Sequence, residues 1–285
     1  GSRLGPSSNF SRMAAPGGGN PGGNQPGGGN PGGNQPGGGN NPWNPGNESS
    51  DNTSSAKAIK SVPAAYVYGG TIVINTSTNG AEGLESKQGI DIEGGQLYLK
   101  CYDDCINSNG QIYFNGGVVV CYSNGNDAVD SNAGAAGAIT IGNGTVLSYS
   151  TVGDPQEGLD CDNNSYIRIT GNGIAISGGG KQSGTSGTVS NAQQGYAFIT
   201  KPSSYSKGTY YTLSDASGNN LVTYSFEASF TNNLSFVTAK GMTSKSTYYI
   251  KSSSSAPTDA STVWHGLYLG SSAAGNTSVA SFTAK

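Results

Sequence analysis

Short runs of alternating apolar and polar residues fill the middle of the chain, and glycines separate them. The alternating apolar positions include Ile90/Ile92, Ile112/Phe114, Ile139/Ile141 and Ile167/Ile169. The separating glycines are Gly69-Gly70, Gly94-Gly95 and Gly116-Gly117, followed by looser pairs at 142/144 and 171/173. Alternation with a period of two indicates short strands, and glycine supplies the positive φ that tight bends need. Because no segment has a convincing helical period, the sequence predicts an all-β protein.

A four-residue phrase recurs in phase with these glycines, in the order acid, small, aliphatic, acid or Asn. Its copies are Glu82-Gly83-Leu84-Glu85, Asp104-Cys105-Ile106-Asn107, Asp127-Ala128-Val129-Asp130 and Glu157-Gly158-Leu159-Asp160, after a degenerate copy without acids, Ala58-Ile59-Lys60-Ser61. The aliphatic positions 59, 84, 106, 129 and 159 are 25, 22, 23 and 30 residues apart. Such a period indicates a solenoid. Three strands per coil predict a parallel β-helix of about five coils, and the crossover preference of parallel strands favours a right-handed one.

The same patterns divide the chain into four regions. Residues 1–55 are rich in Pro, Gly and Asn, so we expect an extended tether that cannot bury a core. Residues 56–178 form the β-helix, and residues 179–194 form a loop rich in Gly and Ser. Residues 195–285 lose the repeat but keep alternating runs between turn signals. We expect them to form an antiparallel β cap over the open end of the solenoid.

Charge is distributed unevenly along the chain. Residues 82–162 contain 12 of the 17 carboxylates and only two lysines, which gives this stretch a net charge of −10. A basic patch is absent, so nucleic acid is excluded as a partner. No apolar run reaches the roughly 18 residues of a membrane span, so no membrane-spanning segment is expected. The low charged content with abundant Gly, Ser, Thr, Asn and Tyr favours an extracellular protein, either secreted or on the cell surface.

Four cysteines, Cys101, Cys105, Cys121 and Cys161, fit neither a zinc spacing nor a dense disulfide framework. Cys101 and Cys105 flank one predicted turn and are the only pair that we expect to be bridgeable. Cys121 and Cys161 are expected to be buried free thiols. In the alternative interpretation, all four cysteines are small core residues and none is bridged.

Stacked coils would align the repeated acids at the strand spacing of about 4.8 Å. One column would contain Glu82, Asp104, Asp127 and Glu157, and a second would contain Glu85, Asn107, Asp130 and Asp160. Stacked carboxylates repel one another, and a bound cation would resolve the conflict. Oxygen ligands suit Ca²⁺ best, with Asp103 and Asp162 extending the oxygen supply. In the alternative interpretation, these Asp and Asn residues serve only turn chemistry.

The acidic phrases, the phased Gly-Gly strands and the segment Gly195-Tyr196-Ala197-Phe198 resemble a family of secreted bacterial carbohydrate-binding β-helix proteins known from cellulolytic clostridia. The resemblance covers about residues 56–285. It implies a right-handed, pectate-lyase-like β-helix, structural Ca²⁺ on the acids named above, and binding to plant polysaccharide such as cellulose or acidic pectin, without demonstrated catalysis. The chain departs from the family at Cys105, at Cys161 and in its N-terminal tether.

Three functions follow as hypotheses. The first is a Ca²⁺-stabilised polysaccharide-binding protein, in which an exposed row of tyrosines could stack on sugar rings. The second is a structural subunit of an extracellular filament or matrix that assembles through the tether. The third is a Ca²⁺-dependent polysaccharide lyase, with Arg168 or Lys100 as its base. His265 is the only histidine and lies in the predicted cap, so histidine-based catalysis has little support. We assign no catalytic residue and leave the ligand-binding residues open.

Overall fold

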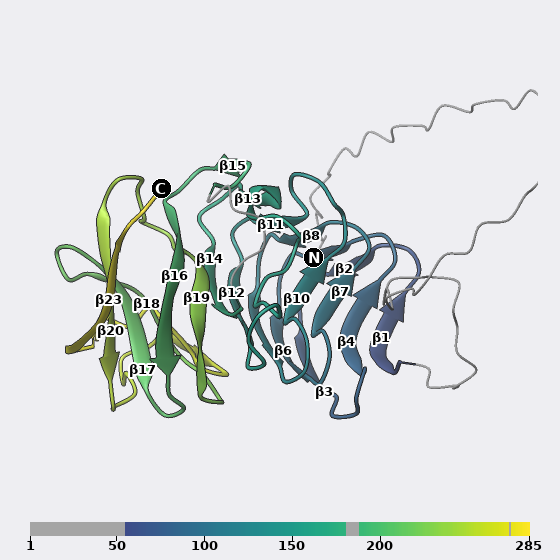
Figure 1. Ribbon diagram of the computed structural model, residues 1–285, viewed down its shortest axis with the longest axis horizontal. Coiled ribbons are helices and arrows are strands. Elements are labelled where there is room, and N and C mark those ends of the chain that lie inside the picture. Colours follow the sequence, from purple (N-terminus) through teal and green to yellow (C-terminus); the bar gives the residue numbers. More distant parts are fainter. Residues whose placement is uncertain (1–54, 181–187, 274) are drawn as a thin grey trace, which may run out of the picture. The chain divides into compact units, whose positions relative to one another are not determined.

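The computed structural model describes residues 55–180, 188–273 and 275–285 (Figure 1). Almost all of the predicted tether, and part of the predicted loop, lie outside these residues. The regular secondary structure of the described residues consists of β-strands and one 3-10 turn, η1 (Asn164–Tyr166). Within those ranges, no helix has the length and apolar character needed to cross a membrane.

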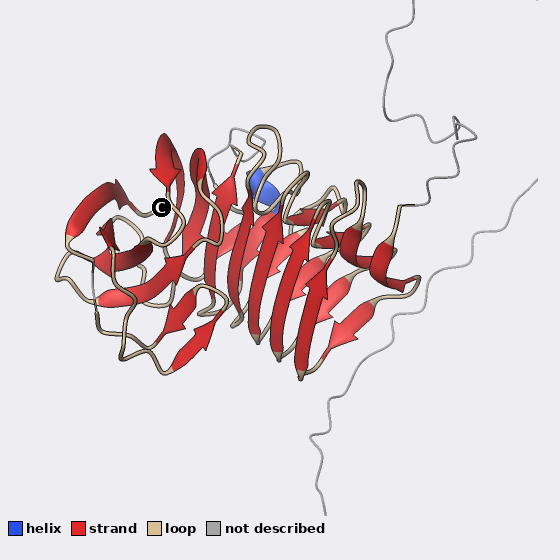
Figure 2. Ribbon diagram, turned by 90° about the horizontal axis from the view of Figure 1, so that it is seen from below, coloured by secondary structure: helices blue, strands red, loops and turns tan. Residues whose placement is uncertain are grey.

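Three sheets of parallel strands form the solenoid, and successive coils lie side by side (Figure 2). Sheet A contains β1 (Lys57–Ser61), β4 (Glu82–Ser86), β7 (Ile106–Ser108) and β10 (Val129–Ser131). Sheet B contains β2 (Ala65–Val67), β5 (Ile90–Ile92), β8 (Ile112–Phe114), β11 (Ile139–Ile141), β13 (Ile167–Ile169) and β15 (Asn191–Ala192). The solenoid part of sheet C contains β3 (Thr71–Asn75), β6 (Gln96–Cys101), β9 (Val118–Ser123), β12 (Thr145–Ser150) and β14 (Ile174–Gly179). The predicted parallel β-helix of about five coils is confirmed. Strand β15 falls in the segment predicted to be a loop.

Alternation along each strand explains the interior of the solenoid. On β8, Ile112 and Phe114 are fully buried, whereas Tyr113 between them is half-buried. Ile112 pairs with Ile90 of the preceding coil and with Ile139 of the following coil, so like side chains stack along the interior. Full burial of each such side chain contributes about 1.5–3 kcal/mol to folding.

The glycine pairs form the bend between sheets B and C. Gly95 and Gly117 have φ of +97° and +76°, which a residue with a Cβ rarely adopts. A Cβ at Gly116 would overlap the backbone carbonyl oxygen of Glu93 and lie 2.9 Å from its carbonyl carbon. At Gly69, the corresponding position of the first coil, a Cβ would have no atom within 4 Å.

All four cysteines are buried, and none of them forms a disulfide. The expectation for Cys121 and Cys161 is confirmed, and the predicted bridge between Cys101 and Cys105 is wrong. The Cys105 thiol donates a hydrogen bond to the carbonyl oxygen of Leu99, 3.3 Å away. Cys101 and Cys105 both belong to the apolar interior, where these small side chains fill space as thiols.

The C-terminal region extends one solenoid sheet and adds another. Strands β16 (Tyr196–Tyr205) and β19 (Phe230–Thr238) pair with each other, and β19 continues sheet C beyond β14 in antiparallel orientation. Sheet D is antiparallel and contains β17 (Tyr210–Asp215), β18 (Asn220–Ser225), β20 (Thr247–Ser253), β21 (Thr262–Trp264), β22 (Leu267–Leu269) and β23 (Thr277–Thr283).

This region also covers the outer face of sheet C. Tyr149 of β12 stacks on Phe230, with ring centroids 5.9 Å apart, and meets Phe226 edge to face at 4.9 Å. The indole N–H of Trp264 donates to the carbonyl oxygen of Leu97, 2.9 Å away. Tyr98 donates to the Glu227 carboxylate at 2.7 Å. The C-terminal region therefore covers much of the outer side of sheet C, although Val73 of its first strand is exposed.

Candidate functional site

One member of each acidic phrase lies in a single column along sheet A, here called the outer acidic column. Glu85 lies beside Asn107, and Asn107 lies beside Asp130. Asp160 extends the column through an isolated parallel bridge to Asp130. These pairings have the register that the repeat predicts. In the first coil the corresponding position is Lys60, next to Glu85.

The other acidic members form the buried acidic column, which consists of Glu82, Asp104, Asp127 and Glu157. Hydrogen bonds join neighbouring coils at these positions. The N–H of Gly83 donates to the carbonyl oxygen of Asp104, and the N–H of Ala128 donates to that of Glu157, both at 2.9 Å. The N–H of Glu157 donates to the Asp127 carboxylate. Four acidic side chains are thus held in order under the surface of the solenoid.

Lysines neutralise the first acidic coil, which the sequence analysis did not anticipate. Lys57 pairs with Glu82, and Lys87 pairs with Glu85. Lys60 lies 3.2 Å from Glu85. Burial disfavours the charge on Glu85, but hydrogen bonds from Lys87 and Lys60 outweigh it, so its pKa is lowered. At Glu82, the effect of burial on the carboxylate charge is larger than the effect of the hydrogen bond from Lys57, so the pKa is raised. The sequence did contain a sign of these ion pairs, because lysines occupy the acidic positions in the degenerate first copy.

The following coils have a different electrostatic character. Burial, reinforced by the charge of Asp130, raises the pKa of Asp104 to about 10. Burial also raises the pKa of Asp127 to about 8, although the N–H of Glu157 opposes the shift. At Asp130, burial and the neighbouring Asp160 raise the pKa to about 7. These carboxyl groups share a crowded, poorly solvated region in which their joint ionisation is unfavourable.

Asp104 has one satisfied and one unsatisfied oxygen. The Asn107 amide donates to Asp104 Oδ2 at 2.9 Å. Asp104 Oδ1 is buried and has no hydrogen-bond partner within the described part of the chain. Asp103, beside it, is half-buried, and Asp162 at the far end of the columns is exposed with φ of 62°. A buried acceptor without a partner carries a desolvation cost that a cation or a proton removes.

The predicted ligands lie in columns and not around one point. Among the described residues, no group of three or more His, Cys, Asp or Glu side chains could hold a metal ion as placed. The donor chemistry nevertheless fits a hard cation, because the carboxylates of Asp103, Asp127 and Asp130 are near enough to Asp104 to affect its charge, and carboxylate oxygens are ligands that Ca²⁺ prefers. Rotation of these side chains, with water completing the ligand set, would be needed to hold Ca²⁺.

The candidate bases for a lyase lie away from these columns. Lys100 belongs to sheet C, with its Nζ 5.3 Å from the centre of the Tyr122 ring. Arg168 belongs to sheet B and donates to the carbonyl oxygen of Ala136 at 3.4 Å. Neither lies on sheet A, so the structure does not bring them together with the acids. His265, in the turn between β21 and β22 of the cap, stacks on Tyr98 of sheet C, with ring centroids 3.6 Å apart.

The outer side of sheet B carries a surface that the sequence analysis did not assign. Tyr66 pairs with Asp91 and Asp91 with Tyr113 across three neighbouring strands. The position continues to Thr140 and Arg168. Tyr66 and the nearby Tyr68 are 58% and 76% exposed, respectively. The sequence could have predicted this surface, because residues that alternate with buried isoleucines along a strand face outwards.

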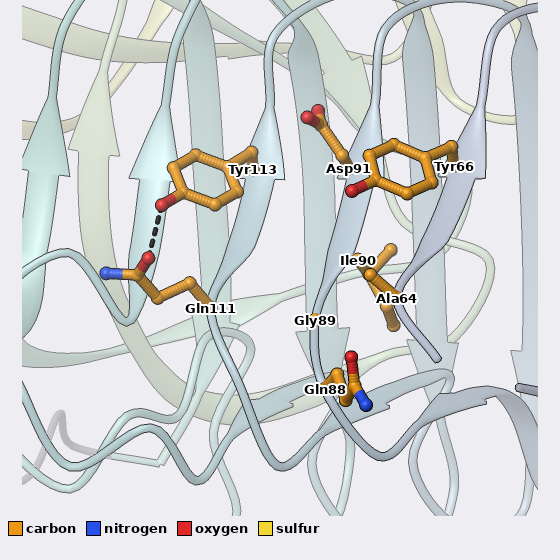
Figure 3. A pocket seen from close by; sticks show the side chains of 8 residues that line it. All are labelled: Ala64, Tyr66, Gln88, Gly89, Ile90, Asp91, Gln111 and Tyr113. Carbon is orange, nitrogen blue, oxygen red and sulfur yellow. Dashed lines mark hydrogen bonds between the residues drawn. The ribbon is translucent and has the colours of Figure 1, made fainter. Parts of the chain in front are cut away.

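A shallow hollow of about 170 Å³ lies on this surface. It is lined by Ala64, Tyr66, Gln88, Gly89, Ile90, Asp91, Gln111 and Tyr113. Figure 3 shows the rings of Tyr66 and Tyr113 on either side of the Asp91 carboxylate, with Gln88 and Gln111 below them. Tyr113 donates a hydrogen bond to the Gln111 side-chain oxygen. We call Tyr66, Tyr68, Gln88, Asp91, Gln111 and Tyr113 the tyrosine face.

Comparison with known proteins gives one match. Residues 49–128 match the family model described as "Carbohydrate-binding domain-containing protein". No curated protein and no solved structure matches the chain. The matched residues include the whole tyrosine face and the acidic columns as far as Asp127. The match therefore supports carbohydrate binding as the function of the chain.

Proposed function

We propose that this chain is a secreted or cell-surface protein that binds polysaccharide of the plant cell-wall type. The observation that carries the proposal is the carbohydrate-binding family match over residues 49–128. These residues form the coils on which Tyr66 and Tyr68 are exposed. Exposed aromatic rings beside planar polar groups are the usual chemistry of sugar recognition, because a ring packs on the apolar face of a sugar while the polar groups bind its hydroxyls.

Binding of the full chain to a glycan panel tests this function. We expect retention on insoluble cellulose or on a pectin in a pull-down, and saturable binding to a soluble oligosaccharide by calorimetry. Release of unsaturated uronate product from pectin would instead support the lyase. No binding to any neutral or acidic plant glycan would overturn the proposed function.

We further propose that Ca²⁺ binds along the acidic columns and stabilises the folded solenoid. The buried, unsatisfied Asp104 Oδ1 and the adjoining carboxylates support this proposal. Glu82, Glu85, Asp103, Asp104, Asn107, Asp127, Asp130, Glu157, Asp160 and Asp162 are the candidate ligands.

Thermal unfolding with Ca²⁺ and with a chelator tests the metal proposal. Ligand at 100 times its dissociation constant adds about 2.7 kcal/mol when only the folded state binds it. For a folded unit of this size, that corresponds to about 5–11 °C in melting temperature. Magnesium at the same concentration is the control for a general ionic effect. Equal melting temperatures in Ca²⁺ and in chelator would show that the columns hold no stabilising ion.

A structural subunit remains the second candidate, because one edge of the solenoid is open. Strands β1, β2 and β3 end their sheets among the described residues, and no further described strand pairs with them on that side. Ile59, Val62 and Val73 of this first coil are exposed. An open strand edge with apolar neighbours favours self-association. Sedimentation over a concentration series, with electron microscopy of native material, distinguishes an assembling subunit from a monomeric binder.

A further inference from the structure

We propose that the tyrosine face is the saccharide-binding site and that it accepts a neutral, extended glycan chain lying across the coils. The inference rests on the proposed polysaccharide-binding function and assigns it a place and a class of ligand. Three observations support it: the spacing of the tyrosine rings, the polar side chains between these rings, and the negative charge of the surface.

Tyr66 and Tyr113 are aligned along the solenoid axis, and Tyr68 lies beside Tyr66 within one coil. Tyr66 and Tyr68 are nearly parallel, with ring centroids 6.2 Å apart and planes inclined by 8°. Tyr113 lies two coils beyond Tyr66 in the same register. Two strand spacings amount to about 10 Å. This distance is close to the length of two sugar units in an extended β-linked chain, so alternate sugars could lie over Tyr66 and Tyr113.

The space between these rings is lined with groups that bind hydroxyls. Gln88 and Gln111 line the same hollow as the tyrosines, and Asp91 lies between the rings (Figure 3). The Asn115 amide donates to Asp91 Oδ1 at 2.9 Å and orients its carboxylate. Amide and carboxylate groups supply the donors and acceptors that sugar hydroxyls require.

Charge selects neutral sugars over uronates at this surface. Asp91 lines the hollow, and Glu93 of the same coil reaches the Asn115 amide that holds Asp91. The residues that line the hollow include no Lys, Arg or His. Arg168 lies three strands away from Asp91 and donates to Ala136, and its guanidinium group lies beside Gly137, as the Gln111 amide does. A uronate chain between Tyr66 and Tyr113 would meet the like charge of Asp91 with no cationic side chain among the residues that line the hollow, whereas a neutral chain would not.

The position of the family match supports this face over the other hollows. All residues lining the sheet B hollow fall within residues 49–128. The hollows around Tyr210 and Asp215 lie in the C-terminal region, outside the match. The cap covers the outward tyrosines of sheet C, Tyr98 and Tyr122, whereas Tyr66 and Tyr68 of the tyrosine face are exposed within the matched coils.

Calorimetry on the full chain tests the inference with two probes, a neutral β-1,4-linked glucose hexamer and a galacturonate hexamer. We expect wild-type protein to prefer the neutral hexamer. Tyr66→Ala and Tyr113→Ala should each weaken its binding about tenfold, because each removes one stacking platform. Tyr102→Ala is the matched control, since Tyr102 is an exposed tyrosine on the turn after β6, away from the face. Asp91→Asn should improve galacturonate binding about tenfold by removing one like charge.

The outcomes separate this site from the function on which it rests. Wild-type protein that binds no glycan overturns the proposed function and this inference together. If wild-type protein binds glycan and both variants, Tyr66→Ala and Tyr113→Ala, bind it equally well with unchanged melting temperatures, the tyrosine face alone is overturned. An equal loss in Tyr102→Ala also overturns it. A preference of wild-type protein for galacturonate overturns the neutral ligand class.

Discussion

Gly116→Ala is expected to lower the melting temperature by roughly 6–12 °C. The new Cβ would overlap the Glu93 carbonyl oxygen, a backbone atom of the preceding coil that cannot rotate away. Overpacking of this kind costs about 3 kcal/mol, and each kcal/mol shifts the melting temperature of a domain of this size by about 2–4 °C. Circular dichroism at a β-sheet wavelength, recorded during heating, measures the change.

Gly69→Ala is the matched control, because Gly69 has the same position in the coil but no coil on its N-terminal side among the described residues. A Cβ there has no atom within 4 Å, and Gly69 does not have a positive φ. We expect its melting temperature to change by no more than about 2 °C. Similar losses in both variants would show that glycine is needed for the bend itself and not for the close stacking of coils.

The solenoid was predictable from sequence because each coil needs the same residue types at the same positions. Every coil must bury isoleucines such as Ile90 and Ile112 and must bend at a glycine pair such as Gly94-Gly95. The isoleucines and the glycine pairs therefore recur in the sequence at a fixed period. The docking of the cap on sheet C was not predictable, since it depends on side chains such as Tyr149 and Phe230 that are distant in sequence. Strand β15 was missed because it has only two residues and lacks an apolar pattern.

The candidate site was predictable only in part, for a similar reason. Repetition gave the register of Glu85, Asn107 and Asp130. It could not give the partners of individual carboxylates, because Lys57 and Lys60 belong to the copy that departs from the repeat. The wrong bridge between Cys101 and Cys105 was inferred from sequence separation alone, which does not fix how the two side chains lie.

The three sheets of the solenoid differ in the side chains that they present outwards. Sheet C carries Tyr98 and Tyr149 outwards and is covered by the cap. Sheet A carries the acidic columns, and sheet B carries the tyrosine face. Because interior residues have similar types in every coil, the outward residues can vary without disturbing the stack. Ion binding and glycan binding can thus be tested separately, by variants on different sheets.

Asp104→Asn is expected to abolish most of the stabilisation by Ca²⁺ while raising stability in chelator. Without a cation, Asp104 must either stay protonated or carry a buried charge, since its pKa is raised to about 10. The amide keeps the size of the side chain and removes that charge. We expect the variant to gain about 1–3 kcal/mol over wild type in chelator at pH 8, and to differ little between Ca²⁺ and chelator. Thermal unfolding of both proteins under both conditions measures these changes.

The pH dependence provides an independent test of the same columns. Asp130, Asp127 and Asp104 have folded pKa values raised to about 7, 8 and 10, so between pH 4 and 8 the folded state binds more protons than the unfolded state. Stability in chelator should therefore fall as the pH rises through this window. Glu85 acts oppositely, because its lowered pKa adds stability that is lost as the pH falls below 4.5. Ca²⁺ requires ionised ligands, so its stabilising effect should grow from pH 5 to pH 8. A Ca²⁺ effect that is independent of pH, and that Asp104→Asn leaves unchanged, would place the ion elsewhere on the chain.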